Sequence, residues 1–139
     1  MGKVLILKTS TDETVQKLIA ELKKNGVNEI ECLVQSSQYR KYQTDYPDID
    51  FIDICGERFE NLSLDIIESI SSKWYSSLYI TLTGERAYNF WNVIEIVYKV
   101  HFRRGFFYNC NGKKRRFSEK DILKDAMCRF YIRWSDFFY

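Results

Sequence analysis

The chain has 139 residues, of which 45% are hydrophobic and 29% are charged, and its formal net charge is +2. With ten Tyr and ten Phe residues this composition excludes a disordered chain, and the length predicts one domain with one sizeable hydrophobic core. A net charge this small says little about partners, because an anionic partner responds to clusters of charge and not to their sum.

The N-terminal segment has the pattern of a buried strand followed by an amphipathic helix. Residues 4–7 form a short continuous apolar run, which is typical of a strand in a parallel sheet. Ser10 and Glu13 form a capping box at the start of a predicted helix, and Asn25-Gly26 ends it. The apolar face of this helix comprises Val15, Leu18, Ile19 and Leu22.

The middle of the chain continues this alternation. Strands are predicted at 30–34 and 49–54, and the stretch between them is polar as far as Pro47. Ser63 is expected to cap a second helix. The apolar face of that helix comprises Leu64, Ile67, Ile70 and Trp74.

The following segment contains a fourth and a fifth strand. The fourth is predicted at 78–82, where Thr83-Gly84 ends it, and the fifth at 106–108, followed by a turn at Asn111-Gly112. A long helix is predicted between them. Its apolar residues are Ala87, Phe90, Trp91, Ile94 and Val97.

Strand and helix patterns alternate about five times, which predicts an α/β fold. We expect residues 1–139 to form a single three-layer Rossmann-like domain, with a mostly parallel five-stranded sheet and helices on both of its faces. In such a sheet, ligands bind beyond the carboxyl ends of the strands.

A C-terminal amphipathic helix is predicted after Ser118 and Asp121, which can cap it. Its apolar stripe comprises Leu123, Met127, Phe130 and Trp134. Cationic residues flank the stripe, and the chain ends in three aromatic residues, 137–139. Two interpretations stay open: the helix packs on the sheet, or its stripe docks on a partner, on a second copy of the chain or on a membrane surface.

No cofactor or metal is predicted. The four Cys residues lie far apart and the chain has one His, so the ligand spacing of a zinc or redox site is missing. No Gly-rich phosphate loop follows the first strand, and His101 is interpreted as structural. The apolar run at 4–7 is too short for a signal peptide or a membrane span, so we expect a cytoplasmic protein, with peripheral membrane attachment left open.

The segment 101–117 holds a cluster of six cations among five aromatic residues, with no acidic residue between 96 and 118. The cations are Arg103, Arg104, Lys113, Lys114, Arg115 and Arg116. Such a cluster can hold phosphate, an anionic glycan or an acidic membrane surface, or it can be a solvated face. Nucleic acid is disfavoured, because the aromatics at 106–108 are needed inside a buried strand.

Five stretches of the chain together resemble one family. Residues 3–10, 32–35 and 46–50 resemble its first strand and loop, its second strand and the entry to its third, while 74–80 and 92–106 resemble the segments around its fourth and fifth strands. The family is the GT-B glycosyltransferases of the heptosyltransferase and cell-surface polysaccharide type, of which the chain resembles the N-terminal, acceptor-side half. The resemblance implies acceptor binding. The donor-binding domain of the family has no room in this chain. The resemblance therefore implies one part of a split or degenerate enzyme, which is inactive without a donor-binding glycosyltransferase subunit or another partner protein.

The same resemblance implies a set of site residues. The first loop of the family carries a Gly-Asp pair whose carboxylate serves as the base, and without gaps this pair falls on Asp12 and Glu13. Glu13 is therefore the candidate catalytic residue, although its capping role explains it without catalysis. The residues expected to bind an acceptor or an anion are Thr9, Ser10, Thr11, Asp12, Gly84 and the six cations of segment 101–117.

A second resemblance points to a signalling module. Residues 18–26, 47–54 and 82–84 resemble the first helix, the phosphoacceptor strand and the switch threonine of response-regulator receiver domains. This resemblance implies that Asp53 is the phosphoacceptor. Residues 8–9 are Lys and Thr where receiver domains carry their magnesium-binding acidic pair, so the alternative is a non-enzymatic pseudo-receiver interaction domain.

Overall fold

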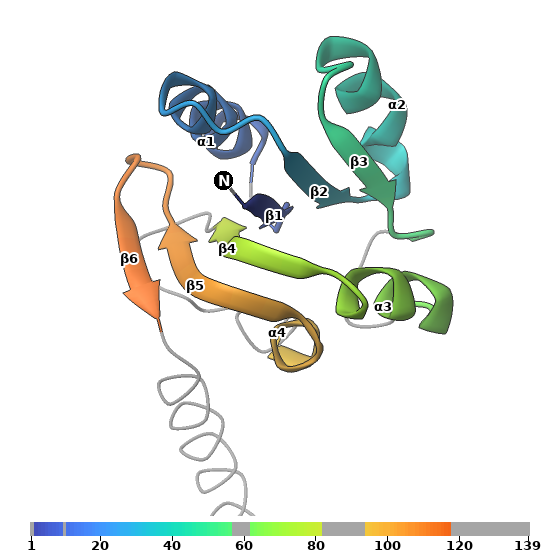
Figure 1. The fold of residues 1–139 in the computed structure, drawn as a ribbon. Coiled ribbons are helices and arrows are strands. Elements are labelled where there is room, and N and C mark those ends of the chain that lie inside the picture. Colours follow the sequence, from blue (N-terminus) through green and yellow to red (C-terminus); the bar gives the residue numbers. More distant parts are fainter. Residues whose placement is uncertain (1, 10, 57–61, 82–93, 118–139) are drawn as a thin grey trace, which may run out of the picture.

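The computed structural model describes residues 2–9, 11–56, 62–81 and 94–117 (Figure 1). The elements in chain order are β1 Lys3–Leu7, α1 Asp12–Lys24, β2 Ile30–Val34, α2 Ser36–Asp45, β3 Asp50–Asp53, α3 Leu64–Ser71, β4 Trp74–Thr81, α4 Ile94–Lys99, β5 His101–Tyr108 and β6 Lys114–Phe117. Strands and helices alternate from β1 to β5, and the sequence predicts this alternation except for α2.

The six strands form one sheet in the order β3-β2-β1-β4-β5-β6. Every neighbouring pair is parallel except β5 and β6, which form an antiparallel hairpin. The order 3-2-1-4-5 is that of the doubly wound Rossmann type, in which the strand order reverses direction between the first and the fourth strand. The predicted α/β, Rossmann-like architecture is confirmed at this level.

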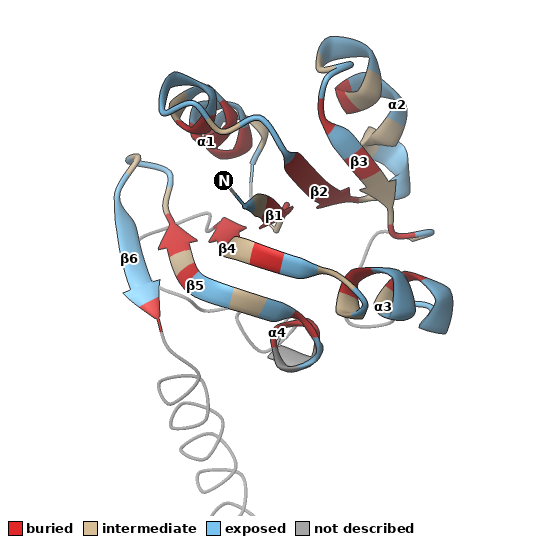
Figure 2. Ribbon diagram, viewed as in Figure 1, coloured by how far each residue is buried: buried red, intermediate tan, exposed pale blue. Residues whose placement is uncertain are grey.

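Helices lie on both faces of the sheet. Alternate residues of β1 point to opposite faces, so that Val4 and Ile6 pack with α1 and Tyr42 of α2, whereas Leu5 and Leu7 pack with α3 and α4. We call these sides the α1 face and the α4 face. The strands β1 and β2 are buried almost throughout, and β6 is exposed over most of its length (Figure 2).

The sheet has six strands and not the five expected, because the predicted basic turn is largely a strand. The turn proper spans 109–113, where the Asn109 amide donates to the Lys113 carbonyl oxygen at 3.0 Å and Gly112 has a φ of +76°. Residues 114–117 then pair with β5. Three of these four residues are cations exposed at the sheet edge, and only Phe117 is a buried apolar residue. The sequence of β6 therefore has no alternation that predicts a strand. β5 likewise begins at His101, before the predicted 106–108.

In the first half of the chain one helix was not predicted, and one predicted helix cap was wrong. The polar stretch before Pro47 contains α2, whose one buried residue is Tyr42, so its sequence lacks an apolar stripe. The predicted capping box is also not formed, because α1 begins at Asp12 with Thr11 at the N-cap position. Glu13 is therefore the second helical residue and not the third, which the capping box requires.

Trp74 was predicted on the apolar face of the helix at 64–74, but α3 ends at Ser71 and Trp74 begins β4. Its side chain is 76% exposed, and that of Leu64 is 75% exposed. The residues that α3 buries are Ile66 and Ile70, four positions apart on one side of the helix.

The predicted C-terminal helix, Ser10, Gly84 and the first part of the helix at 87–97 lie outside the described residues. None of the helices in the described part of the chain has both the length and the hydrophobicity needed to cross a bilayer.

Candidate functional site

The strand order brings the carboxyl ends of β1 and β4 together, and hydroxyl groups join them. The Thr81 hydroxyl donates to the Leu7 carbonyl oxygen at 3.0 Å and accepts from the Thr9 amide at 3.2 Å. The Thr9 hydroxyl donates to the Thr81 carbonyl oxygen at 2.5 Å. Ligands of doubly wound sheets bind where the strand order reverses, so this is the position at which a site is expected.

Beside these threonines, Asp12 of α1 is held by three donors, two from α2 and one from the residue that follows β1. The Tyr42 hydroxyl donates to Asp12 Oδ1 at 2.6 Å, Lys8 Nζ lies 3.4 Å from the same oxygen, and Lys41 Nζ lies 3.4 Å from Oδ2. The Tyr42 hydrogen bond, helped by the two ammonium groups, lowers the pKa of Asp12, although partial burial opposes this. Asp12 is therefore an ionised hydrogen-bond acceptor and a weak proton acceptor at neutral pH.

Lys8 is a buried cation at the end of β1, with 6% of its surface exposed. Its ammonium group lies between Asp12 and the ring of Tyr42, whose centroid is 5.8 Å away. Burial of Tyr42 and its bond to Asp12 raise the Tyr42 pKa, so that the hydroxyl stays a donor. A lysine is almost never buried unless it is paired with an anion, and Asp12 is that partner here.

Gln35, which follows β2, completes the arrangement. Its amide nitrogen donates to the Lys8 carbonyl oxygen at 3.2 Å. Its side-chain oxygen Oε1 is buried and has no hydrogen-bond partner among the described residues. An unpaired buried acceptor is rare in folded proteins and calls for an explanation, such as a donor supplied by a ligand. We name the strand-end cluster by its members, which are Lys8, Thr9, Asp12, Gln35, Tyr42 and Thr81.

The strand-end cluster contains two of the predicted site residues, Thr9 and Asp12. Thr11 lies next to them, with its hydroxyl 3.2 Å from that of Thr14. Glu13, the predicted base, is exposed on the first turn of α1, and no hydrogen bond or ion pair is described for it within the described ranges.

Sequence reasoning missed four members of the strand-end cluster: Lys8, Gln35, Tyr42 and Thr81. One signal was available for Lys8, since a lysine directly after a buried strand must either reach solvent or find a partner. Tyr42 and Gln35 gave no such signal, because α2 itself was not predicted.

Asp53, the alternative phosphoacceptor, lies elsewhere. It ends β3 at the edge of the sheet, with β2 between it and β1. Asp53 Oδ1 accepts from the Ser36 hydroxyl at 2.5 Å and from the Cys55 amide at 2.8 Å, which supports the left-handed Cys55, with φ +59°. In the 2-1-3-4-5 order of receiver domains the third strand lies beside the first. The order here is different, so the fold gives the signalling interpretation no support.

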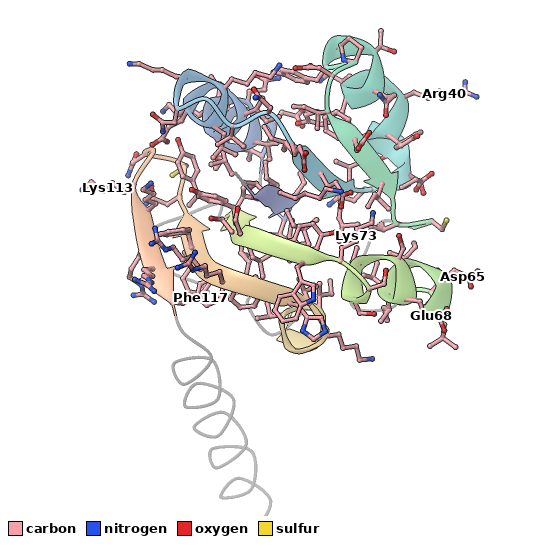
Figure 3. All side chains as sticks on the ribbon, viewed as in Figure 1. Arg40, Asp65, Glu68, Lys73, Lys113 and Phe117 are labelled. Atoms are coloured by element: carbon pink, nitrogen blue, oxygen red, sulfur yellow. The ribbon has the colours of Figure 1, made fainter. Side chains whose placement is uncertain are left out.

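The basic hairpin, β5 with β6, carries all six predicted cations, and each of them is exposed. Side-chain nitrogens crowd along β6 between the labelled Lys113 and Phe117 (Figure 3). The cations do not converge on one point: Lys114 Nζ lies 5.2 Å from the Phe106 ring centroid, whereas Arg115 covers Phe107 at 5.4 Å, on the opposite side of the sheet. The hairpin is therefore an extended charged surface and not a pocket.

A second polar cluster lies at the amino ends of the strands. Glu31 of β2 is 3% exposed. Its Oε1 lies 2.9 Å from Lys73 Nζ and 3.2 Å from Lys3 Nζ, and its Oε2 accepts from the Tyr75 hydroxyl at 2.6 Å (Lys73 is labelled in Figure 3). These bonds lower the pKa of Glu31 in spite of its burial. We call these four residues the amino-end cluster.

No group of three or more His, Cys, Asp or Glu side chains that could hold a metal occurs in the described part of the chain. The search against protein-family models gives no match, and neither does the search of curated proteins. The function therefore has to be argued from the site itself.

Proposed function

We propose that this chain is the acceptor-binding half of a glycosyltransferase-like enzyme, and that it binds a hydroxyl-rich acceptor at the strand-end cluster. On this proposal it is one part of a split or degenerate enzyme. It does not transfer sugar alone, and a separate donor-binding subunit is its partner.

The observation that carries the proposal is the buried Gln35 Oε1, which has no partner in the described part of the chain and lies at the carboxyl edge of the sheet. An acceptor oxygen of this kind needs an O–H or N–H donor, and a ligand hydroxyl supplies one. Asp12 offers a second acceptor, since its side chain is 37% exposed and its lowered pKa keeps it ionised. Two acceptors at the same edge of the sheet suit a ligand with several hydroxyl groups.

Binding has better support than catalysis. A general base works best when its pKa is near the working pH, and the pKa of Asp12 is shifted the other way. Glu13 is exposed on α1, without a described partner that would orient it. The strand-end residues thus favour recognition of an acceptor, with the chemistry completed by a partner.

The test is an NMR titration of the isotopically labelled full chain with neutral and acidic oligosaccharides, and separately with nucleotide sugars. The expected result is saturable shifts of the Thr9, Gln35 and Thr81 amides with at least one oligosaccharide. Nucleotide sugars should leave these amides unchanged.

Two variants sharpen this titration. Gln35→Leu removes the buried acceptor and should weaken oligosaccharide binding by about tenfold, the equivalent of one or two hydrogen bonds. Glu29→Gln, an exposed position outside the strand-end cluster, is the control and should bind as the wild type does. Saturation of the same amides by a nucleotide sugar, or the absence of any oligosaccharide effect on them, would refute the proposal.

A further inference from the structure

Two aromatic side chains extend the basic hairpin into a broader surface on the α1 face. Tyr75 and Phe102 point into the core of the α4 face. Their chain neighbours Trp74 and His101 point the other way, to the α1 face, because adjacent residues of a strand alternate. A register shift between Tyr75 and Ser77 separates this pair from the regular alternation of the later residues. The two strands pair Trp74 with His101, and the rings stack with centroids 4.6 Å apart.

Three cations share that face. Phe106 and Tyr108 belong to its core, and Arg116 and Lys114 stand directly opposite them on β6. Arg104 lies two residues before Phe106 and so has the same orientation. We call the surface made by Trp74, His101, Arg104, Lys114 and Arg116 the β4–β6 face.

The β4–β6 face has no described counter-charge that neutralises its cations. The described ion pairs join lysines at positions 3, 8, 23, 41 and 73 to carboxylates, and none reaches β5 or β6 within the described residues. Glu21 of α1 borders the face, where its carboxylate adds to the effect of burial in raising the pKa of Tyr108. Arg104, Lys114 and Arg116 are all exposed, so their charge is available to an anionic partner.

The dimensions and chemistry of this surface favour an extended partner. Trp74 lies opposite His101, at the start of β5, and Lys114 lies opposite Tyr108 at its end, so the face is about 23 Å long at 3.3 Å per residue. One small anion cannot contact all of it. A nucleic acid is a poor candidate, because its bases cannot stack on Phe106. Lys114 lies over one side of that ring, and Tyr79 stacks on it with centroids 5.1 Å apart.

Trp74 decides the kind of partner. It is 76% exposed, although folding normally buries much of a tryptophan. An indole favours the boundary between lipid and water, where its ring meets apolar groups while its N–H stays hydrated. A flat array of cations with an exposed indole at one end matches an anionic headgroup layer.

We infer that the β4–β6 face binds the surface of an anionic lipid bilayer, with Arg104, Lys114 and Arg116 on the headgroups and Trp74 at the lipid–water boundary. This binding site is separate from the strand-end cluster and does not depend on the acceptor-binding proposal. Each cation near an anionic surface is expected to strengthen binding about fivefold, an effect that falls as salt rises.

The test is sedimentation of the full chain with vesicles of phosphatidylcholine alone and with added phosphatidylglycerol, at low and at physiological salt. Binding is expected only with phosphatidylglycerol. The triple variant Arg104→Ser, Lys114→Ser and Arg116→Ser should bind about 100-fold more weakly, the product of three such effects. Brominated lipids should quench tryptophan fluorescence in the wild type, and Trp74→Phe should remove that component.

A matched control carries the same loss of charge elsewhere, as Lys23→Ser, Lys24→Ser and Arg40→Ser, all at exposed positions. Its affinity for the vesicles should stay within about threefold of the wild-type affinity, because the charges removed lie away from the β4–β6 face and salt screens them. Equal loss in both triple variants, or no binding at low salt by a chain whose circular dichroism shows it folded, would overturn the inference. So would preferential binding of an acidic polysaccharide or an oligonucleotide that displaces the chain from the vesicles.

Discussion

The two polar clusters at opposite ends of the sheet use the same groups in different ways. In each, one carboxylate accepts from a tyrosine hydroxyl at 2.6 Å and faces two lysine ammonium groups, which for Asp12 are those of Lys8 and of the neighbouring Lys41. In the amino-end cluster the carboxylate is the buried partner, with the Glu31 side chain 4% exposed and the lysines about one-third exposed. In the strand-end cluster the cation is buried, with the Lys8 side chain 7% exposed and Asp12 37% exposed.

Because different partners are buried, we assign stability to the amino-end cluster and binding to the strand-end cluster. Both carboxylates receive three donors, but Glu31 is buried and no ligand can reach it, so the amino-end cluster is expected to hold β1, β2 and β4 together. A buried lysine with an open carboxylate keeps acceptor capacity facing outward, which suits a ligand. The predictions below test whether the two ends differ in this way.

The largest effect is expected from Glu31→Gln. Removing the charge leaves two ammonium groups without their anion, and because these are partly exposed we expect a loss of about 2–3 kcal/mol in the free energy of unfolding, below the full cost of breaking a buried pair. Urea denaturation measures it. The control is Glu29→Gln, exposed and two residues away, and a Glu31→Gln loss within about 0.5 kcal/mol of that control would contradict the assignment.

The next effect is a loss of stability in acid. The pKa values of Glu31 and Asp12 are lowered in the folded state, so the stability they contribute is fully present above the pKa of the unfolded chain, about 4. It is lost as pH falls through the lower folded values. Denaturation midpoints between pH 7 and pH 3 should fall less steeply for Glu31→Gln than for the wild type. Parallel curves would show that Glu31 is not linked to folding.

A matched pair of tyrosine variants compares the two clusters directly. Tyr75→Phe takes a hydroxyl from a buried carboxylate and should cost about 1.5–3 kcal/mol. Tyr42→Phe takes one from a carboxylate that water can reach, so we expect about 0.5–1.5 kcal/mol. Thermal and urea unfolding give both values. Equal losses would mean that water does not reach Asp12.

The smallest effect on stability is expected from Asp12→Asn, about 0.5–1 kcal/mol, because its ion pairs are partly exposed. The same variant should weaken oligosaccharide binding at the strand-end cluster, which Glu31→Gln should leave intact. Calorimetric titration measures the oligosaccharide affinity of each variant, and urea denaturation measures its free energy of unfolding. An Asp12→Asn chain that is strongly destabilised yet binds normally would reverse the roles given to the two clusters.

Periodicity in the sequence predicted the elements with strong apolar patterns and missed those without. The runs at 4–7 and 30–34 and the stripe of α1 are found as expected, because burial on the sheet requires those side chains. α2 buries only Tyr42, and β6 buries only Phe117, so neither element has a periodic pattern of apolar residues in its sequence. α2 is tied to α1 by the hydrogen bond from Tyr42 to Asp12, and β6 is held by its pairing with β5.

For the candidate site, the sequence suggested Thr9 and Asp12 through the glycosyltransferase resemblance, and the cations of the hairpin because they cluster in the chain. It could not assemble the strand-end cluster, whose members come from positions 8 to 81 and meet only through the strand order. Trp74 was misplaced for a related reason: its spacing from Ile70 fits a helix, and only the end of α3 at Ser71 assigns it to a strand.

By itself, the sequence determined most of the alternation of strand and helix, most of the apolar faces and the clustering of cations in segment 101–117, because each depends on residues close together in the chain. Only the tertiary structure decided which strands are neighbours, which carboxylate is buried and which aromatic is left exposed. Those properties depend on the crossover between β1 and β4 and on the pairing of β5 with β6, which bring distant residues within hydrogen-bond and packing distance.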